Sequence, residues 1–245
     1  MKLTDALGNV YTFPANFRVN GFNWKKKTRI TEVAFADGGD ETGDNKQSTR
    51  LIEIEGVLAD NATYFTTQNT LNSWLIKKDM KLCINSGTYI NVKTIGGASY
   101  SFFDGAYGRV SKVKFSCICT DPYFYSDTLT VVSTLITTIP QTITLVNSSL
   151  FSILPIYTIT NIANNPSVII ENTTDGGNFF SYTDAAFLAG DVLIVNTLDG
   201  TVKKNGINVI LNFLGSFPRI IAGTQILLVN SASATLDISY RNAEL

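Results

Sequence analysis

The second half of the chain consists of short runs of β-branched and other apolar residues separated by proline, asparagine and glycine. β-Branched side chains favour extended backbone. The pairs Asp199-Gly200 and Asn205-Gly206 suit tight hairpin turns, because glycine adopts a positive φ at little cost. Many short strands at regular spacing are typical of a β-sandwich. Strands are therefore predicted at residues 128–137, 142–146, 156–162, 167–171, 192–196, 201–204, 225–230 and 235–240.

The first half mixes strands with a single helix. Alternating apolar and polar residues predict strands at 29–35, 50–58, 80–84, 88–95 and 108–119. Residues 37–47, between the first two strands, are glycine-rich and acidic, which indicates a mobile loop or the tip of a long hairpin.

The helix is predicted within residues 62–78. Its apolar residues at roughly helical spacing are Phe65, Leu71, Trp74 and Leu75. Asp60 or Asn61 is a suitable N-cap, and Lys77 and Lys78 suit the negative end of the helix dipole.

The two halves also differ in charge. Up to residue 125 the chain carries 15 basic and 12 acidic residues, a net charge of +3, whereas the remainder carries 4 and 8, a net charge of −4. A composition shift of this kind marks a domain boundary. The predicted domains are residues 1–127 and 128–245.

Histidine is absent from all 245 residues. This excludes a Ser-His-Asp triad, a Cys-His dyad and histidine ligands to a metal. A net charge of −1 and an isoelectric point of about 5.5 do not provide the basic surface that nucleic-acid binding requires. Residues 1–13 lack the apolar core of a secretion signal, so folding in a reducing cytoplasm is expected. No cofactor is predicted.

The thiols and one carboxylate pair are weak candidates for chemistry. The cysteines Cys83, Cys117 and Cys119 are odd in number, and the C-x-C spacing is too tight for a good local disulfide, so buried free thiols are expected. Glu53 and Glu55 lie two apart on one strand, a spacing that a glycosidase acid pair can have. They lie opposite the apolar residues of that strand, where solvent-facing side chains belong.

Two segments of opposite charge are candidates for contacts between subunits. The basic segment, which follows Phe22 and Trp24, contains Lys25, Lys26, Lys27 and Arg29. The acidic segment contains Asp37, Asp40, Glu41 and Asp44. Other interpretations are a clamp for single-stranded nucleic acid or a solvated strand edge for the basic segment. Calcium binding by the acidic segment is a further interpretation, although it lacks the register of a calcium loop.

The segment Asp121-Pro122-Tyr123-Phe124-Tyr125 follows the strand at 108–119 directly. Proline removes a backbone donor and restrains the preceding residue to extended geometry, so the strand must turn here. Three aromatic side chains then provide apolar area that can seal one domain against the next. We expect an interdomain corner at these five residues.

These features together resemble the distal tail proteins of long-tailed bacteriophages, the Dit-like hub proteins of the baseplate and tail tip. The resemblance rests on the order of four motifs along nearly the whole chain. They are a polar loop with Asp37-Gly38, the strand Ile52-Glu53-Ile54-Glu55-Gly56 before the helix, the segment Asp121–Tyr125, and a C-terminal series made of Gly190-Asp191-Val192, residues 199–206 and residues 218–223.

The resemblance implies an all-β fold with one helix. Residues 1–127 would form a β-sandwich-like domain with a helix and an arm, six copies of which close into a ring, and residues 128–245 a galectin-like β-sandwich. The family is structural rather than enzymatic. Implied partners are further copies of the chain, the tail-tube protein, the tail-tip protein and receptor-binding proteins or fibres. DNA would pass through the ring unread, and the protein would reside in the virion after assembly in the host cytoplasm.

Two other functions stay open at this point. The C-terminal sandwich is alternatively a carbohydrate-binding module or adhesin, in which Phe179, Phe180, Tyr182 and Phe187 stack on sugars and Asn178 and Asp184 bind hydroxyls; the alternative role for the aromatics is the core. The third hypothesis is a β-rich hydrolase that uses Glu53, Glu55 or Asp121.

Overall fold

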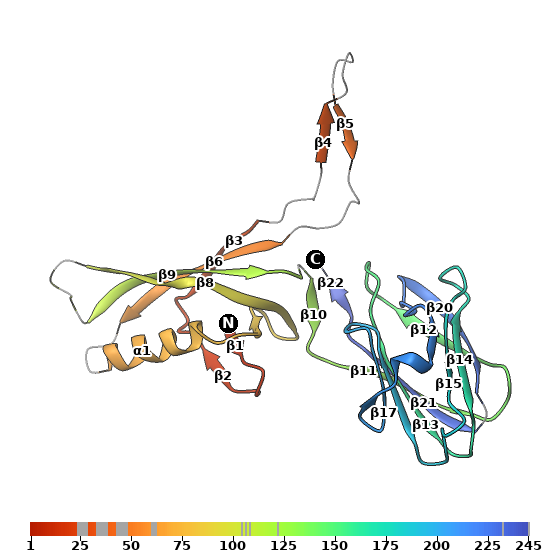
Figure 1. Ribbon diagram of the computed structural model, residues 1–245. Helices are drawn as coiled ribbons and strands as arrows, with labels where there is room; N and C mark the ends of the chain where they lie inside the picture. The colour runs from red at the N-terminus through yellow and green to blue at the C-terminus, as the bar shows by residue number, and fades with distance from the viewer. Residues whose placement is uncertain are drawn as a thin grey trace. The chain divides into compact units, whose positions relative to one another are not determined.

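The computed structural model describes residues 1–23, 29–32, 39–42, 49–59, 63–103, 105, 107, 109–121, 123–231 and 233–244. These residues divide into two compact units, Met1–Phe124 and Tyr125–Glu244 (Figure 1). The predicted boundary, after residue 127, lies just beyond this division. The fold is β-rich with one α-helix in the described part of the chain, which confirms the predicted fold class. No helix among these residues has the length and apolar character needed to cross a membrane.

The N-terminal unit is built on one sheet with the strand order β2-β1-β7-β8-β9-β6-β3. Its strands are β1 (Lys2–Thr4), β2 (Val10–Thr12), β3 (Arg18–Asn23), β6 (Arg50–Ala59), β7 (Met80–Cys83), β8 (Thr88–Phe102) and β9 (Val110–Cys119). The long strand β8 pairs first with β7 and then with β9, and its register shifts between Ile95 and Ser99. The strand predicted from the sequence ended at residue 95, immediately before Gly96-Gly97. Gly96 adopts a φ of 71° at the irregularity, and the strand continues beyond it.

Period-two alternation decides which face of this sheet is buried. In β6 the buried residues include Ile52, Ile54 and Leu58, and β9 buries Phe115 and Cys117 on the same side. The polar residues between them face outward. This arrangement is the one predicted from the sequence.

Helix α1 (Tyr64–Leu75) covers the buried face (Figure 1). Leu71, Trp74 and Leu75 are buried as predicted, but Phe65 is 54% exposed and its neighbour Tyr64 lies in the core instead. Phe65 did not belong with the other three: Tyr64 precedes Leu71 and Leu75 by seven and eleven positions and shares their face, whereas Phe65 lies about 100° around the helix from it. The N-cap residue is Thr63, not Asp60 or Asn61, and its side chain makes no capping hydrogen bond.

A separate two-stranded sheet combines part of the predicted strand at 29–35 with part of the segment at 37–47, which was predicted to be a mobile loop or the tip of a long hairpin. Strands β4 (Arg29–Glu32) and β5 (Gly39–Thr42) pair in antiparallel fashion. Residues 39–42 are therefore a strand of a hairpin and not its tip, and the predicted strand at 29–35 is described as far as residue 32.

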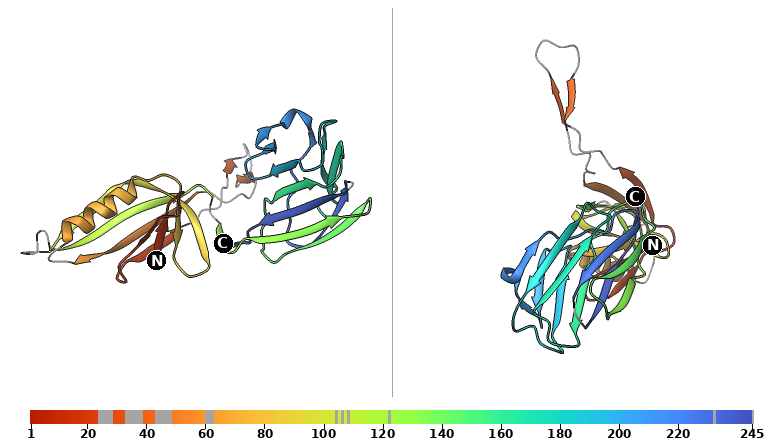
Figure 2. Two further views of the ribbon diagram at one scale, coloured as in Figure 1. Left: turned by 90° about the horizontal axis from the view of Figure 1, so that it is seen from below. Right: turned by 90° about the vertical axis from the view of Figure 1, so that its right-hand side faces the viewer.

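The C-terminal unit contains two sheets, and Figure 2 shows them facing each other. One sheet has the order β11-β21-β13-β16-β17-β18, and its strands are β11 (Thr130–Ile136), β13 (Ile156–Asn161), β16 (Val192–Asn196), β17 (Thr201–Lys204), β18 (Ile207–Asn208) and β21 (Ala234–Tyr240). The other has the order β12-β20-β14-β15-β19, and its strands are β12 (Gln141–Asn147), β14 (Ser167–Asn172), β15 (Asn178–Thr183), β19 (Phe213–Gly215) and β20 (Gly223–Asn230). A 3-10 helix, η1 (Ile210–Asn212), precedes β19, and the short strands β10 (Phe124–Ser126) and β22 (Ala243–Glu244) pair with each other.

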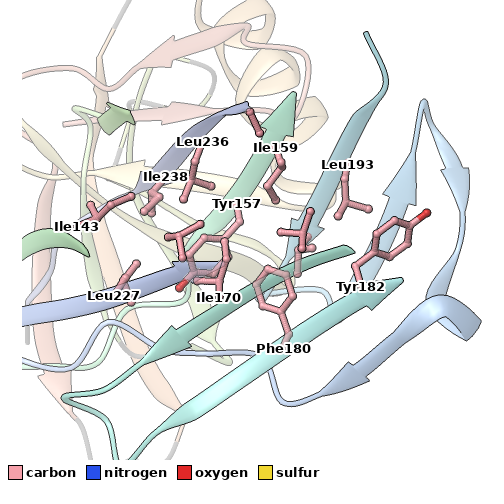
Figure 3. Packing of buried hydrophobic residues seen from close by; sticks show 14 of the residues in the cluster. Ile143, Tyr157, Ile159, Ile170, Phe180, Tyr182, Leu193, Leu227, Leu236 and Ile238 are labelled. Atoms are coloured by element: carbon pink, nitrogen blue, oxygen red, sulfur yellow. The ribbon is translucent and has the colours of Figure 1, made fainter. Parts of the chain in front are cut away.

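The inner faces of these two sheets form a dry core (Figure 3). Tyr157 and Phe180 lie ring to ring at 5.6 Å, and both are fully buried. All eight strands predicted for this half of the chain are present. Strands β15, β18, β19 and β22 were not predicted.

Candidate functional site

The outer face of the N-terminal sheet carries paired charges. The Lys114 Nζ atom lies 3.0 Å from Glu53 Oε2, and the Lys112 Nζ atom lies 3.6 Å from Glu55 Oε2. A hydrogen bond from Asn20, and then the nearby lysines, lowers the pKa of Glu55. Exposed pairs of this kind add little stability, but they favour one strand register over others. The two glutamates are therefore side chains of an ion-paired outer surface, on the solvent side predicted for them.

An aromatic patch is formed by Tyr64 and Phe65 at the start of helix α1, Phe102 at the end of β8, and Tyr107. Adjacent ring centroids lie 5.3 Å apart for Phe65 and Tyr64, 5.9 Å for Tyr64 and Phe102, and 4.7 Å for Phe102 and Tyr107. Phe65 is 54% and Tyr107 76% exposed. Buried Tyr64 is fixed by a 2.6 Å hydrogen bond between its hydroxyl and Ser111 Oγ. Exposed aromatics on a fixed base are typical of protein–protein contact surfaces, because their apolar area is ordered before binding.

The outward face of helix α1 continues this patch without any charged residue. The exposed residues of the middle turns are Thr66, Asn69, Thr70 and Ser73. The Thr70 hydroxyl donates to the Thr66 carbonyl and the Ser73 hydroxyl to the Thr70 carbonyl, so both are satisfied within the helix. A surface that carries no charge costs less to dehydrate than a charged one. This patch was not predicted from the sequence, where its signal is a helix of 12 residues with no acidic or basic side chain.

A charged anchor follows the end of the helix. The Lys77 ammonium lies 2.8 Å from Asp5 Oδ2 and 3.6 Å from the centroid of the Trp74 ring. The hydrogen bond from Lys77, together with those from Asn9, lowers the pKa of Asp5 to about 2. Lys77 thus fastens the helix end to the N-terminal strands, beyond the dipole role predicted for it.

The predicted subunit-contact residues lie partly outside the described residues. This is the case for Lys25, Lys26, Lys27, Asp37 and Asp44. The others belong to one hairpin: Arg29 opposes Thr42, Ile30 opposes Glu41, and Thr31 opposes Asp40. Arg29 therefore lies in the same hairpin as Asp40 and Glu41 within each chain.

The predicted interdomain corner has half-buried side chains. Asp121, Tyr123, Phe124 and Tyr125 are each half-buried, and Pro122 lies outside the described residues. The Phe124 ring packs on the N-terminal core, with the guanidinium carbon of Arg50 5.4 Å from its centroid. Arg50 is itself buried, and burial lowers its pKa. A seal between domains at these residues stays a prediction.

The C-terminal motifs of the sequence resemblance form the scaffold of the sandwich. The Asn205 amide donates to Asp191 Oδ1 at 2.7 Å and accepts from the Val192 N–H at 2.9 Å, so the Gly-Asp and Asn-Gly motifs bind each other. Buried Asn172 donates to the Arg219 carbonyl at 2.7 Å and holds residues 218–223 in place. These motifs specify loop geometry.

The aromatic residues of the carbohydrate hypothesis are mostly core. Phe180, Tyr182 and Phe187 are buried, and Phe179 is 41% exposed. Asp184 is already engaged, because Lys204 Nζ lies 2.5 Å and the Tyr182 hydroxyl 2.9 Å from Asp184 Oδ2. The contact with Lys204 lowers the pKa of Asp184. Three of the four stacking rings are therefore unavailable to a sugar.

The three thiols are free and buried, as predicted. Burial raises the pKa of Cys117 and of Cys119 to about 12, so both remain protonated and unreactive at neutral pH. Within the described ranges, no group of three cysteine, aspartate or glutamate side chains is placed to hold a metal ion.

Comparison with known proteins identifies the C-terminal part. Residues 149–243 match the family model of the siphovirus-type tail component, C-terminal domain. The fold is similar to the crystal structure of the Dit protein (gp 19.1) of phage SPP1, described as a paradigm of the hub adsorption apparatus in phages that infect Gram-positive bacteria, with a TM-score of 0.74 and 16% identity over 100% of this chain and 99% of that one. It is also similar to a chain of the baseplate of phage P2 in its activated, calcium-bound conformation, with a TM-score of 0.52 and 12% identity over 97% and 96% of the two chains. Comparison with curated protein sequences gives no match. The predicted resemblance to Dit-like distal tail proteins is confirmed.

Proposed function

From the premise that residues 149–243 are a siphovirus-type tail component domain, we propose that this protein is the distal tail hub of a long-tailed phage. Six copies would form a ring that joins the tail tube to the tail tip or baseplate and to the receptor-binding apparatus. The observation that supports this best is the SPP1 Dit fold over the full length of both chains. The protein would act as a structural component of the virion, not as an enzyme.

The proposed partners follow from this role. The ring would contact the tail-tube protein on one side and the tail-tip protein on the other, with receptor-binding proteins or fibres at its periphery. Phage DNA would pass through the lumen without being read. The aromatic patch and the uncharged face of α1 are suitable contact surfaces, because they are ordered and cost less to dehydrate than a charged surface.

Contacts between neighbouring copies would be heterologous, as in any head-to-tail ring. We assign one such contact to the two charged segments, so that Lys25, Lys26, Lys27 and Arg29 of one copy meet Asp37, Asp40, Glu41 and Asp44 of the next. Opposite charge fixes the register of such a contact more than it adds affinity.

Native mass spectrometry of the purified chain tests the ring. We expect a species of six copies, or a multiple of six. A stable monomer at tens of micromolar concentration would contradict the proposal.

Charge reversal tests the contact between the charged segments. Changing Lys25, Lys26 and Lys27 to Glu should shift the ring toward smaller species in sedimentation velocity. Reversing the acidic residues of the same chain to Lys should restore the ring. The matched control changes Lys78, Lys93 and Lys203 to Glu, which moves the net charge equally; a control as damaging as the test variant would refute the assignment.

A further inference from the structure

Strand β11 is an unusual edge strand. It is the outermost strand of its sheet in the described part of the chain, and it has seven residues. Residues 128–170, which include β11, contain no Asp, Glu, Lys or Arg. Natural edge strands are usually short or carry charges or proline, because an open edge pairs with any available strand. The edge formed by β11 has none of these protections.

Hydrogen bonds in the same sheet show which backbone groups face the open side. Asn161 N–H donates to the Asp191 carbonyl and Thr197 N–H to the Pro155 carbonyl, so the odd-numbered residues of β13 face β16. Backbone groups alternate in direction along a strand. The even-numbered residues of β13 pair with odd-numbered residues of β21, so the even-numbered residues of β21 face β11. These pair with the even-numbered residues of β11, whose N–H and C=O groups therefore point toward β21. The residues whose N–H and C=O groups face the open side are Val131, Ser133 and Leu135.

One end of this edge is already capped. The Gln141 amide donates to the Leu135 carbonyl at 3.1 Å and accepts from the Thr137 N–H at 3.0 Å. Within the described residues, no strand pairs with Val131 or Ser133 on that side. A further strand can therefore bind the backbone N–H and C=O groups of Val131 and Ser133 and the N–H of Leu135.

The side-chain pattern of β11 matches its own reverse. Val131 and Leu135 lie symmetrically about Ser133, and each is 54% exposed. An antiparallel second copy centred on Ser133 places Val131 opposite Leu135 and Ser133 opposite itself. The strand itself has no charge. The charged residue in register with it, Asp237 opposite Ser133, lies on β21, one strand away from the contact, so two identical copies do not bring like charges face to face. We propose that the β11 edges of two copies of this chain pair in antiparallel fashion about Ser133 and join their sheets.

The pairing makes four backbone hydrogen bonds without displacing Gln141. Two join the N–H and C=O groups of Ser133 in the two copies, and two run from the Leu135 N–H of each copy to the Val131 carbonyl of the other. The exposed Val131 and Leu135 side chains come into cross-strand contact on the outer face of the joined sheet.

This contact lies in the C-terminal unit and goes beyond the ring proposed above. The ring and the β11 pairing change the mass of the assembly by different factors, so an experiment can refute either proposal without refuting the other. A ring with β11 pairing gives an assembly of twelve copies, and a ring without it gives six. Pairing through β11 without a ring gives a dimer, and the absence of both contacts gives a monomer.

Ser133→Lys tests the pairing in the full chain, because it places two lysines opposite each other at the symmetry axis. Native mass spectrometry should show that this variant has half the mass of the wild-type assembly. The control is Thr183→Lys, on an exposed position of β15 in the other sheet. Equal masses for Ser133→Lys and wild type, with unchanged circular dichroism, would overturn the proposal.

Ser133→Cys provides the positive test. Directly opposed strand residues have Cα atoms about 5.5 Å apart, within reach of a disulfide. Mild oxidation should cross-link this variant into covalent dimers on a non-reducing gel, whereas Thr183→Cys should remain monomeric under denaturing conditions. The native cysteines do not compete, because they are buried. Folded Ser133→Cys that forms no dimer, or that cross-links only to a different tail protein, would refute pairing between copies.

Discussion

The two units of this protein make their surfaces in different ways. The N-terminal sheet carries rows of opposite charges on its outer face, such as Lys114 with Glu53. The C-terminal sandwich has few charges and instead orders its loops with buried amides, such as Asn172 and Asn161. Surface ion pairs are weak and sensitive to salt, whereas buried amides cannot be removed without leaving backbone groups unsatisfied. The first unit should therefore respond to ionic conditions, and the second to single substitutions in its interior.

The largest effect is expected in the sandwich core, where two adjacent aromatics provide a matched pair. Phe180→Ala should lower the free energy of unfolding of the C-terminal unit by about 3–5 kcal/mol, because it empties a buried ring site. Phe179→Ala, on the outer face, should change it by less than about 0.5 kcal/mol. Both tryptophans, Trp24 and Trp74, lie in the first half, so their fluorescence follows the N-terminal unit while circular dichroism follows both. A similar loss for both variants would contradict the assignment of Phe179 to the surface.

The buried amides should come next in magnitude. Asn172→Ala removes the donor to the Arg219 carbonyl and the acceptor for the N–H groups of Thr174 and Asp175. Leaving such groups unsatisfied should cost the C-terminal unit about 3 kcal/mol in urea unfolding. The control Asn178→Ala, an exposed residue with one side-chain bond, should cost less than about 0.5 kcal/mol. Equal effects would show that Asn172 does not hold the loop.

A smaller effect, confined to the N-terminal unit, depends on pH. The folded-state pKa of Asp5 is about 2, below its ordinary value of 3.8, so the contact with Lys77 stabilises the unit above about pH 4 and is lost as the pH falls through 2. Asp5→Asn should unfold at a lower urea concentration than wild type at pH 6, and the difference should be smaller at pH 2, where Asp5 is still partly ionised in the folded protein. Carboxyl NMR should show the Asp5 pKa rising toward its ordinary value in Lys77→Met. An unchanged pKa in that variant would show that Lys77 is not the main cause.

The smallest effect is expected at the ion pairs of the N-terminal sheet. A double-mutant cycle of Lys114→Ala and Glu53→Ala should give a coupling of about 0.3–0.5 kcal/mol at low salt, because both side chains are well exposed. High salt should abolish this coupling by screening. Tryptophan fluorescence would report it. A coupling that survives high salt would show that the N-terminal unit is not the salt-sensitive one.

The sequence predictions were more accurate for the C-terminal unit than for the N-terminal unit. In the sandwich, alternation and turn residues act locally, and residues 192–196 and 201–204 were predicted with the bounds that β16 and β17 have. In the N-terminal unit, Phe65 was grouped with Leu71, Trp74 and Leu75 by approximate helical spacing, but Tyr64 is the residue that shares their buried face. The exposed aromatic patch was missed because it brings residues from the helix and from the β8–β9 connection together.

The amino-acid sequence alone determined the β-rich class, the position of the helix, the change in composition between the halves and the order of the family motifs, because each is a local property of the chain. Only the tertiary structure decided that Tyr182 is buried in the core and that Asp184 is paired with Lys204. It likewise decided that Arg29 shares a hairpin with Asp40 and Glu41. It also decided that β11 lies at an open edge. Strand order and burial depend on contacts between residues far apart in the chain, which no local pattern specifies.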